Sequence, residues 1–413
     1  MSGTRDAVTP QPLPSRRRVL GGLLGSLAGA VALSGCAGTN MPSLPSSSDI
    51  FGSGPPPQAA APAGPPSIGT GQVKVGLVLP LSAAGNAGLA GQSMRNAAEL
   101  ALAEFNNPDI QLLVKDDGGT AQGAQQATQA ALEEGAEIIL GPLFAQSVGA
   151  AGQTARARNV PLIAFSTDSN VATRGVYLLS FLPESDVDRI VEYAVAQGRR
   201  SFIALMPDNA YGSVVEAEFK QMVAKKGARV VALERYSPDR GRMQEAVRLI
   251  ASGASRADAV LIADGGEQVV TMAQLLVGNG VQFKRLQALG TGLWGDDPRI
   301  SAESSLDGAW FPAPDMAGFR AFSTRYRTRY NQDPVRTATL AYDAVALVAA
   351  LVKTQGPQRF SEAVLTNPSG FAGIDGVFRF RNDGTNQRAL AIQKVTPQGG
   401  QVVAPAPRTF TGT

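Results

Sequence analysis

Beyond residue 71, short apolar runs alternate with longer segments in which apolar residues recur three and four positions apart. A short apolar run bounded by turn residues is typical of a buried strand, and the longer spacing is typical of an amphipathic helix. The first part of this region is predicted to hold strands over 73–79, 110–114, 138–140 and 162–165, and helices over 91–105, 121–132 and 148–158. Such alternation favours a parallel sheet with helices on both faces.

The same alternation repeats in the next part of the chain. Strands are predicted over 202–206, 230–233, 260–263 and 286–289, and helices over 190–197, 211–226, 243–251 and 269–276. The section that follows is mostly helical, over 319–330 and 339–352. The last two predicted strands, 377–380 and 390–395, flank a turn at Asn382-Asp383-Gly384.

Two α/β units in succession predict an α/β fold with two doubly wound parallel-sheet lobes, joined by a hinge, and a ligand cleft between them. We expect one domain over 72–402, followed by a disordered tail over 403–413. The expected first lobe spans 72–183 and 313–375, and the expected second lobe spans 184–312 and 376–402. Ligands of open parallel sheets bind outside the carboxyl ends of the strands, and two facing lobes can close over a ligand by hinge bending.

The N-terminal residues 1–36 have the pattern of a secretory signal. Three arginines, 16–18, precede an uncharged run over 19–35 that is too short to span a bilayer comfortably. The sequence Leu33-Ser34-Gly35-Cys36 resembles a bacterial lipobox, which implies that Cys36 carries a lipid as the first residue of the mature protein. The arginine pair resembles a twin-arginine signal, with the general secretory route left open. The alternative is an uncleaved N-terminal anchor with a free Cys36.

Residues 37–71 are rich in Pro, Gly, Ser and Ala, and Asp49 is their only charged residue. Such a segment cannot bury enough apolar surface to offset its conformational entropy. We therefore expect a disordered tether that holds a globular head away from a membrane.

Composition excludes several classes of function. The 413 residues contain no histidine and one cysteine, so catalytic arrangements that need imidazole, histidine-ligated zinc and an intramolecular disulfide are excluded. The net charge is only +3, which gives no indication of a nucleic-acid partner. We expect a protein that is not an enzyme, with no catalytic residues, no metal and no cofactor.

Three further motifs have an ordinary structural interpretation. The run 290–295 matches a dinucleotide fingerprint, but no helical pattern follows it, which favours a turn. The run 116–119 could hold a cation through Asp116 and Asp117, although a loop that starts a helix is the preferred interpretation. The helix over 319–330 carries four arginines and two tyrosines, which indicates either a solvated face or a partner surface.

The order and spacing of several short motifs resemble the type I periplasmic-binding-protein fold, in the branch of the leucine/isoleucine/valine receptors. The motifs are 75–82 (VGLVLPLS), 115–119 (KDDGG), 140–143 (LGPL), 161–166 (PLIAFS), 208–212 (DNAYG) and 341–345 (AYDAV). The resemblance covers about 72–400.

This resemblance implies a ligand cleft built from loops that follow strands. The implied cleft residues are Ser82, Phe144, Ala145, Gln146, Ser147, Ser166, Thr167, Asp168, Tyr211, Asp264, Thr291 and Gly292. Two of them depart from the pattern of amino-acid receptors, because Ala145 stands where a hydroxyl usually meets the ligand carboxylate and Gly292 where an acid meets the ammonium. A buried zwitterion without charged partners is costly, unless Asp168 or Asp264 compensates.

A second resemblance, to penicillin-binding-protein activator lipoproteins, is carried by 141–144 (GPLF), 371–376 (FAGIDG) and 386–390 (NQRAL). It implies regulation of peptidoglycan synthesis, with a penicillin-binding protein as partner. The alternative is the substrate-binding lipoprotein of an ABC importer for branched-chain amino acids or a related small molecule, with an ABC permease as partner. Either function implies a lipid-anchored protein in the periplasm of a Gram-negative bacterium, with the outer membrane preferred.

Overall fold

The computed structural model describes residues 66–106, 108–295 and 297–410. The predicted signal with Cys36, the tether up to residue 65 and the tail 411–413 lie outside the described residues. Within the described part of the chain, no helix is both long and apolar enough to span a membrane.

The first lobe is built on a six-stranded sheet of order β1-β3-β2-β4-β5-β6, parallel except for the β1–β3 pair. Its strands are β1 (Ser67–Ile68), β2 (Val73–Leu79), β3 (Ile110–Asp116), β4 (Ile138–Leu140), β5 (Leu162–Ala164) and β6 (Val176–Leu178). Its helices include α1 (Asn86–Glu104), α2 (Ala121–Glu133) and α3 (Ala145–Arg156). Helix α2 begins at Thr120, whose side chain accepts from the Gly123 N–H and so satisfies a free donor of the first turn.

The second lobe is built on a seven-stranded sheet of order β16-β15-β11-β10-β9-β7-β8. The strands are β7 (Ser201–Pro207), β8 (Arg229–Tyr236), β9 (Ala259–Ile262), β10 (Gln287–Leu289), β11 (Trp310–Ala313), β15 (Ala391–Thr396) and β16 (Gly399–Ala404). The helices are α4 (Pro183–Ala196), α5 (Ala210–Lys225), α6 (Arg240–Ala251), α7 (Gly266–Gly278) and the short α8 (Pro298–Ala302). The five strands from β7 to β11 are parallel to one another. Strand β15 pairs antiparallel with β11, and β16 pairs antiparallel with β15.

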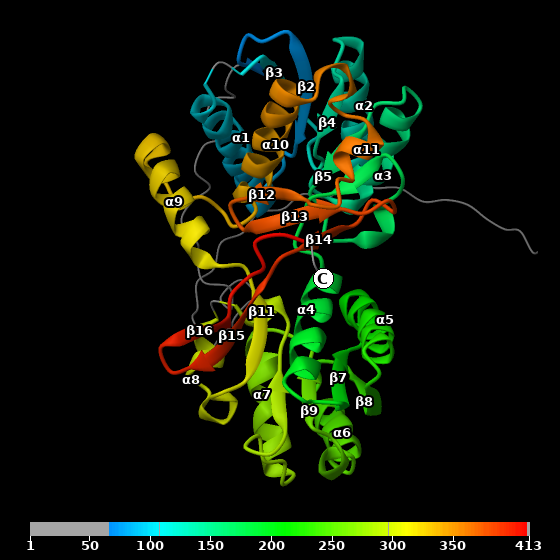
Figure 1. Cartoon of the computed structure of the whole chain (residues 1–413), viewed down its shortest axis with the longest axis vertical. Helices are drawn as coiled ribbons and strands as arrows, with labels where there is room; N and C mark the ends of the chain where they lie inside the picture. The colour runs from blue at the N-terminus through cyan, green and yellow to red at the C-terminus, as the bar shows by residue number, and fades with distance from the viewer. Residues whose placement is uncertain (1–65, 107, 296, 411–413) are drawn as a thin grey trace, which may run out of the picture. The chain divides into compact units, whose positions relative to one another are not determined.

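Later segments return to the first lobe. They are α9 (Met316–Tyr330), α10 (Ala338–Thr354), α11 (Glu362–Leu365), β12 (Phe371–Gly373), β13 (Gly376–Phe380) and β14 (Asn386–Arg388). Phe322 and Tyr326 of α9 share an apolar cluster with Ala97 of α1, and Phe378 and Phe380 of β13 join the core beneath the first sheet. Figure 1 shows α10 beside α1 and the three strands β12 to β14 at the end of this lobe that faces the second.

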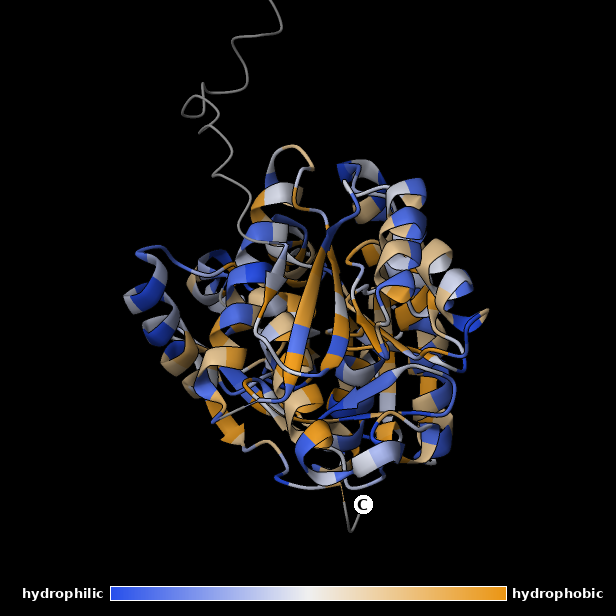
Figure 2. Cartoon of the chain, turned by 90° about the horizontal axis from the view of Figure 1, so that it is seen from above, coloured by the Kyte–Doolittle hydropathy of each residue, from blue (hydrophilic) through white to orange (hydrophobic). Residues whose placement is uncertain are grey.

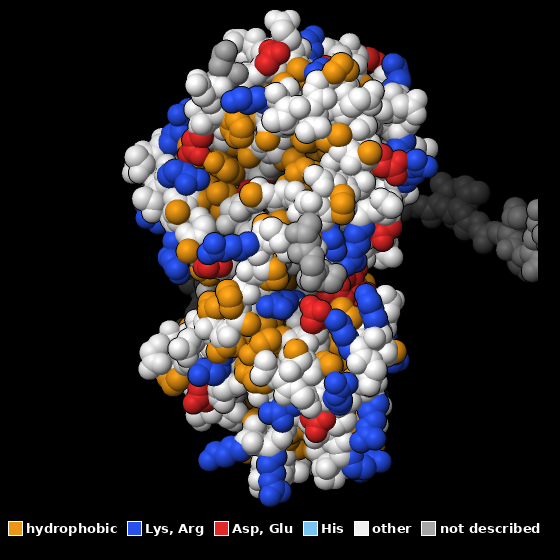
Figure 3. Space-filling model, viewed as in Figure 1, with side chains coloured by type: hydrophobic (Ala, Val, Ile, Leu, Met, Phe, Trp, Pro, Cys, Tyr) orange, Lys and Arg blue, Asp and Glu red, His pale blue; other side chains and the backbone are white. Residues whose placement is uncertain are grey.

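Apolar strands form the centre of both lobes. Strands β4, β5, β7 and β9 are buried along their whole length, and Figure 2 shows orange strands between helices whose outer turns are blue. Figure 3 shows acidic and basic side chains interspersed over one face of the molecule. Buried apolar strands between amphipathic helices are what a doubly wound sheet requires. The predicted α/β fold with parallel-sheet lobes is confirmed.

The strands differ from the sequence-based expectation in three ways. Strands β1, β6, β11, β12, β14 and β16 were not predicted; β1 lies within the range expected to be a tether, and β16 continues to Ala404, inside the expected tail. The turn at 382–384 joins β13 to β14, not to 390–395. Strands β13 and β14 therefore belong to a separate three-stranded sheet against the first lobe, although 376–402 was assigned to the second lobe; only β15 and β16 join the second sheet.

Three segments connect the lobes: 179–182 before α4, 314–315 after β11, and 389–390 between β14 and β15. The first is tied by hydrogen bonds to β14, which leads into the third. The Asn386 amide donates to the carbonyl oxygens of Leu178 and Ser180, each at 2.8 Å, and Arg388 Nε donates to Ser180 O at 2.9 Å. These bonds fix the position from which α4 enters the cleft.

Candidate ligand-binding cleft

Residues of both lobes line a cavity of about 730 Å³. Its wall is mainly apolar, with side chains that include Phe181, Leu182, Val214, Leu293 and Leu390. The remaining residues on the wall are Thr167, Asp168, Asn170, Pro183, Ser185, Asp186, Ala210, Tyr211, Gly292, Gly295, Ala313, Pro314, Met316, Arg336, Arg388 and Gln393. An apolar cavity with a few polar groups is the usual form of a site for a small molecule.

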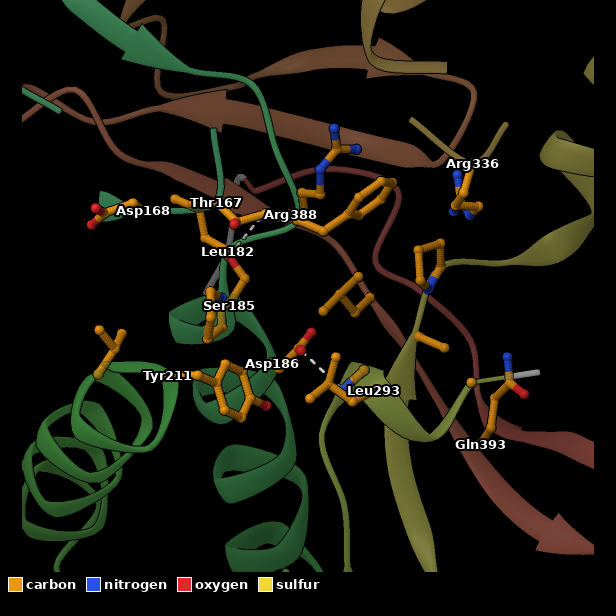
Figure 4. Close-up of a pocket in the computed structure, with 18 of the residues that line it drawn as sticks. Thr167, Asp168, Leu182, Ser185, Asp186, Tyr211, Leu293, Arg336, Arg388 and Gln393 are labelled. Atoms are coloured by element: carbon orange, nitrogen blue, oxygen red, sulfur yellow. Dashed lines mark hydrogen bonds between the residues drawn. The ribbon is translucent and has the colours of Figure 1, made fainter. Parts of the chain in front are cut away.

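Asp186, in the first turn of α4, is the most distinctive polar group on this wall. Its Oδ2 accepts a hydrogen bond of 2.9 Å from the Gly292 N–H, and Figure 4 shows the carboxylate projecting between Tyr211 and Leu293. Burial raises the pKa of Asp186 to about 7, and the nearby Glu184 acts in the same direction, against the Gly292 hydrogen bond. The Asp186 carboxylate is therefore partly removed from water by the apolar surface around it.

Tyr211 lies beside Asp186 at the start of α5. Asn209 caps this helix by accepting from the Gly212 N–H, which sets the direction of the first turn. The Tyr211 hydroxyl is 2.7 Å from Thr291 Oγ1, and burial raises the Tyr211 pKa, so the ring carries a neutral hydroxyl to the cavity. Asp186 and the Tyr211–Thr291 pair thus form a polar group on the second-lobe wall.

On the first-lobe wall, Arg336 is matched by an acid within the protein. Arg336 binds the fully buried Asp375 through two nitrogens, with bonds of 2.9 and 2.7 Å. Its guanidinium also lies 4.6 Å from the centre of the Phe181 ring and 4.7 Å from that of Phe319. Paired and stacked in this way, Arg336 contributes mostly to the structure of the wall.

Arg388 lies on the other face of Phe181, with its guanidinium 4.6 Å from that ring and 5.5 Å from the Phe378 ring. It is 3% exposed, and its two terminal nitrogens donate to no hydrogen bond within the described part of the chain. Burial lowers its pKa, while the negative charges of Asp343 and Asp375 oppose that effect. Burial raises the pKa of Asp343 to about 7. Figure 4 shows the Arg388 guanidinium turned from the cavity into the first lobe.

Four of the twelve residues predicted for the cleft lie on the cavity wall: Thr167, Asp168, Tyr211 and Gly292. Thr291 stands directly behind Tyr211. Asp264 also lies in the second lobe, where it accepts from the Tyr236 hydroxyl at 2.7 Å and from the Gly265 N–H. The structure thus brings the predicted second-lobe residues together around Tyr211.

The remaining predicted residues belong to the first lobe and serve its own turns. The Ser82 N–H donates to Asp116 Oδ1 at 3.1 Å, the Gln146 amide donates to Gly119 O at 3.2 Å, and Ser166 Oγ accepts from the Asp168 N–H. Phe144 packs near Gly119, Ala145 begins α3 and Ser147 is buried within it. These six residues are not among those that line the cavity.

Sequence reasoning missed Asp186, Arg336 and Arg388. The run Pro183-Glu184-Ser185-Asp186 does signal a helix start, because proline and acids favour the first turn. It gives no sign of the partner of Asp186, since Gly292 lies 106 residues further along the chain.

The other three motifs have structural roles. Gly292–Trp294 forms a single helical turn with Trp294 buried, and Asp116 and Asp117 accept from the N–H groups of the following glycines. Nowhere in the described ranges do three or more Asp, Glu, Cys or His side chains gather as a metal site would need.

On α9, the Arg325, Arg327 and Arg329 side chains pair with Glu104, Asp333 and Glu99, which favours the solvated-face interpretation for these three.

A family model described as "Periplasmic binding protein" matches residues 72–401. The chain is similar in structure to a candidate branched-chain amino acid ABC transporter from Rhodospirillum rubrum, with a TM-score of 0.71 and 19% identity over 80% of this chain and 99% of that one. It is also similar to an ABC transporter substrate-binding protein from Desulfitobacterium hafniense in complex with Leu, with a TM-score of 0.58 and 15% identity over 80% of this chain and 99% of that one.

Among curated proteins, the chain is 23% identical over 138 residues to an uncharacterized protein of Rickettsia prowazekii (strain Madrid E). That match covers 33% of this chain and 37% of the relative.

Proposed function

The chain belongs to the periplasmic binding protein family, and we propose that it is the substrate-binding component of an ABC importer for an amino acid or a related small, largely apolar molecule. Members of this family are generally ligand binders without enzymatic activity, and membership implies a periplasmic location. The observation that carries the proposal is the cavity of about 730 Å³ between the lobes, a size suited to a small organic molecule.

The hinge region supports the same function. Three segments connect the lobes, and the Asn386 and Arg388 side chains of β14, which leads into 389–390, donate hydrogen bonds to Ser180 O in 179–182. Bending at such short connections would open the cavity to a ligand and close it again. The lipid on Cys36 and the tether predicted over 37–71 belong to this proposal, because they would hold the binding domain at a membrane that contains the permease.

The activator of a penicillin-binding protein, preferred on sequence alone, gains no support from the comparisons, which fit the import receptor better. The cavity also argues for the receptor, because a protein that acts through its surface does not need an enclosed apolar site.

Crosslinking of the tagged full-length chain in intact cells, with its partners identified by mass spectrometry, tests the proposal. We expect an ABC permease to be recovered. A peptidoglycan synthase in its place would contradict the receptor function and favour the activator. A Cys36→Ala variant serves as the matched control, since we expect it to leave the membrane fraction and to lose the crosslink.

A further inference from the structure

The end of the second lobe that lies away from the cavity is strongly basic. Strands β7, β8, β9 and β10 are parallel and begin nearly level with one another, so the segments that lead into them lie side by side. Tyr211 and Gly292 reach the cavity from beyond the carboxyl ends of these strands, which places the four segments at the opposite end of the sheet. The segments are 197–200, 225–229, 252–258 and 279–286.

These four segments, which we call the basic end, contain eight basic residues and one acid. They are Arg199, Arg200, Lys225, Lys226, Arg229, Arg256, Lys284, Arg285 and Asp258. The net charge of the whole chain is only +3, so positive charge is concentrated here and is outweighed by acids elsewhere. A patch of one sign on an otherwise balanced protein creates a local field that attracts a partner of the opposite sign.

Most of this charge is not neutralised within the protein. Lys226 pairs with Glu192 at 2.6 Å, and the Asp258 carboxylate accepts from the Arg200 and Ser201 backbone N–H groups. The other basic side chains of this end, apart from the half-buried Arg199, are exposed and form no ion pair within the ranges that the structure describes. They are Arg200, Lys225, Arg229, Arg256, Lys284 and Arg285.

The ordinary structural role of basic residues explains only part of this arrangement. A cation in the last turn of a helix is stabilised by the helix dipole, which accounts for Lys225 on α5 and for Arg248 on α6. It does not account for Arg200, Lys284 and Arg285, which lie in the connections outside the helices. Figure 3 shows mainly Lys and Arg side chains at the lower end of the molecule, where α6 and α7 end in Figure 1.

Two exposed apolar side chains accompany the charge. Leu249, near the end of α6, is 46% exposed, and Val277, in the last turn of α7, is 47% exposed. Both helices end where the segments of the basic end begin. Charge alone would suit any acidic macromolecule, whereas basic and apolar side chains together suit a bilayer, because the cations meet the lipid phosphates while the apolar groups enter the interface.

We propose that the basic end of the second lobe binds the surface of a bilayer that contains anionic phospholipid. This inference goes beyond the proposed receptor function and does not depend on it. The lipid predicted on Cys36 would keep the chain close to a membrane, where the effective concentration of the surface is high and a modest attraction is enough for contact. The contact would hold the second lobe against the membrane with its sheet ends toward the lipid.

The fluorescence of a probe on the full-length protein tests this assignment. Cys36 is the only cysteine of the chain, so Gln282→Cys adds one labelling site at an exposed position of the basic end. The protein, labelled with an NBD group, is combined by detergent removal with vesicles of phosphatidylglycerol and phosphatidylcholine in equal parts, or of phosphatidylcholine alone. We expect NBD emission to rise about twofold or more with the anionic vesicles only, and the rise to shrink as NaCl is added.

Two labelling controls accompany this measurement. The native chain, labelled in parallel, gives any contribution from Cys36. Gln125→Cys places the same probe at an exposed position of α2 in the first lobe, where we expect no rise.

Two further variants of the Gln282→Cys protein have equal net charge. The first neutralises four cations of the basic end, and we expect it to lose the rise: Arg200→Gln, Lys225→Gln, Lys284→Gln and Arg285→Gln. The second neutralises four cations of α9, and we expect it to keep the rise: Arg320→Gln, Arg325→Gln, Arg327→Gln and Arg329→Gln. Circular dichroism checks that both variants fold.

The remaining outcomes overturn the proposal. Emission that does not rise, that rises equally with both kinds of vesicle, or that rises equally in the two charge variants would show that the basic end does not bind anionic lipid. Retention of the protein on immobilised polyglutamate, without any response to vesicles, would assign this surface to an acidic macromolecule. None of these results bears on the receptor function, which the permease crosslink tests separately.

Discussion

The charged side chains on the two walls of the cleft differ in how they are bonded within the protein. On the first-lobe wall, Arg336 is bound to the fully buried Asp375, and Asp168 accepts from the backbone and side-chain N–H groups of Asn170. On the second-lobe wall, Asp186 has a backbone N–H on one oxygen, and no cation among the described residues pairs with either oxygen. Charges that are satisfied within a protein stabilise its fold, whereas one left open is available to a ligand. Substitutions on the first wall should therefore change stability, and those on the second should change binding.

The largest effect is expected from Asp375→Ala. This change removes the acceptor of Thr339 Oγ1 and of the Arg336 guanidinium, whose side chain is 35% exposed, and we expect it to lower the free energy of unfolding by about 2–4 kcal/mol. Urea denaturation measures the loss. Asp333→Ala is the control, because Asp333 forms an exposed pair with Arg327 and should cost less than about 1 kcal/mol. Equal losses in the two variants would mean that the first-lobe wall does not depend on its internal pair.

The pH dependence of stability distinguishes Asp186 from a paired acid. The pKa of Asp186 is about 7 in the folded state, well above its ordinary value of 3.8, mainly through burial. The folded protein thus holds this proton more tightly than the unfolded chain, so stability falls as pH rises from about 4 to about 7. We expect Asp186→Asn to remove this part of the dependence and to gain on the order of 1–3 kcal/mol relative to the native chain between pH 5 and pH 8.

The stability of the Asp186→Asn variant is compared with that of the native protein because other groups titrate in the same pH range. Asp343 and Glu218 also have pKa values raised to about 7 by burial. The groups that face Asp186 are Glu184 on α4, Tyr211 on α5 and the Gly292 N–H, and none of them is changed in the variant. Parallel stability curves for the two chains would show that Asp186 is not a buried, unpaired acid.

A smaller effect is expected from Gly292→Ala. The added Cβ displaces the Asp186 carboxylate from its position, and we expect the affinity for an amine ligand such as L-leucine to fall about tenfold, equivalent to about 1.4 kcal/mol. Titration calorimetry measures the change. Gly295→Ala is the control on the same wall, since its Cβ would meet only Gly292 O, at 3.3 Å. If the affinity of Gly292→Ala is unchanged, Gly292 is not needed for binding of the amine.

The smallest effect is expected from Ser82→Ala. Ser82 is bonded to Asp116 by its backbone and side chain, and does not line the cavity. We expect a loss of about 0.5–1 kcal/mol in stability and less than a twofold change in ligand affinity. A tenfold loss of affinity would instead place the ligand at the strand ends of the first lobe, where the family resemblance predicted it.

Most of the fold could be predicted from the sequence, because buried strands and amphipathic helices leave a local pattern. Strand β4 begins and ends where predicted, α2 ends one residue later than predicted, and α6 begins three residues earlier. Strand β14 left no such pattern, since it reads Asn386-Gln387-Arg388 and is buried through hydrogen bonds of its side chains. The strand at 390–395 was therefore paired with the wrong neighbour.

The candidate site was harder to predict than the fold. Tyr211 and Gly292 were predicted because the resemblance to amino-acid receptors implies ligand groups in loops that follow strands, and both residues line the cavity. Asp186 was missed because its role depends on a contact with Gly292 that only the folded chain brings about. The sequence thus indicated where the cleft lies and not which acid faces it.

A crystal structure of the full-length protein with bound L-leucine would test the account most directly. We predict the ligand nitrogen at about 2.7–3.0 Å from a carboxylate oxygen of Asp186, with the apolar body against Leu293 and Leu390. A ligand seated instead against Ser82, Ala145 and Ser166, with its amine away from Asp186, would contradict the account.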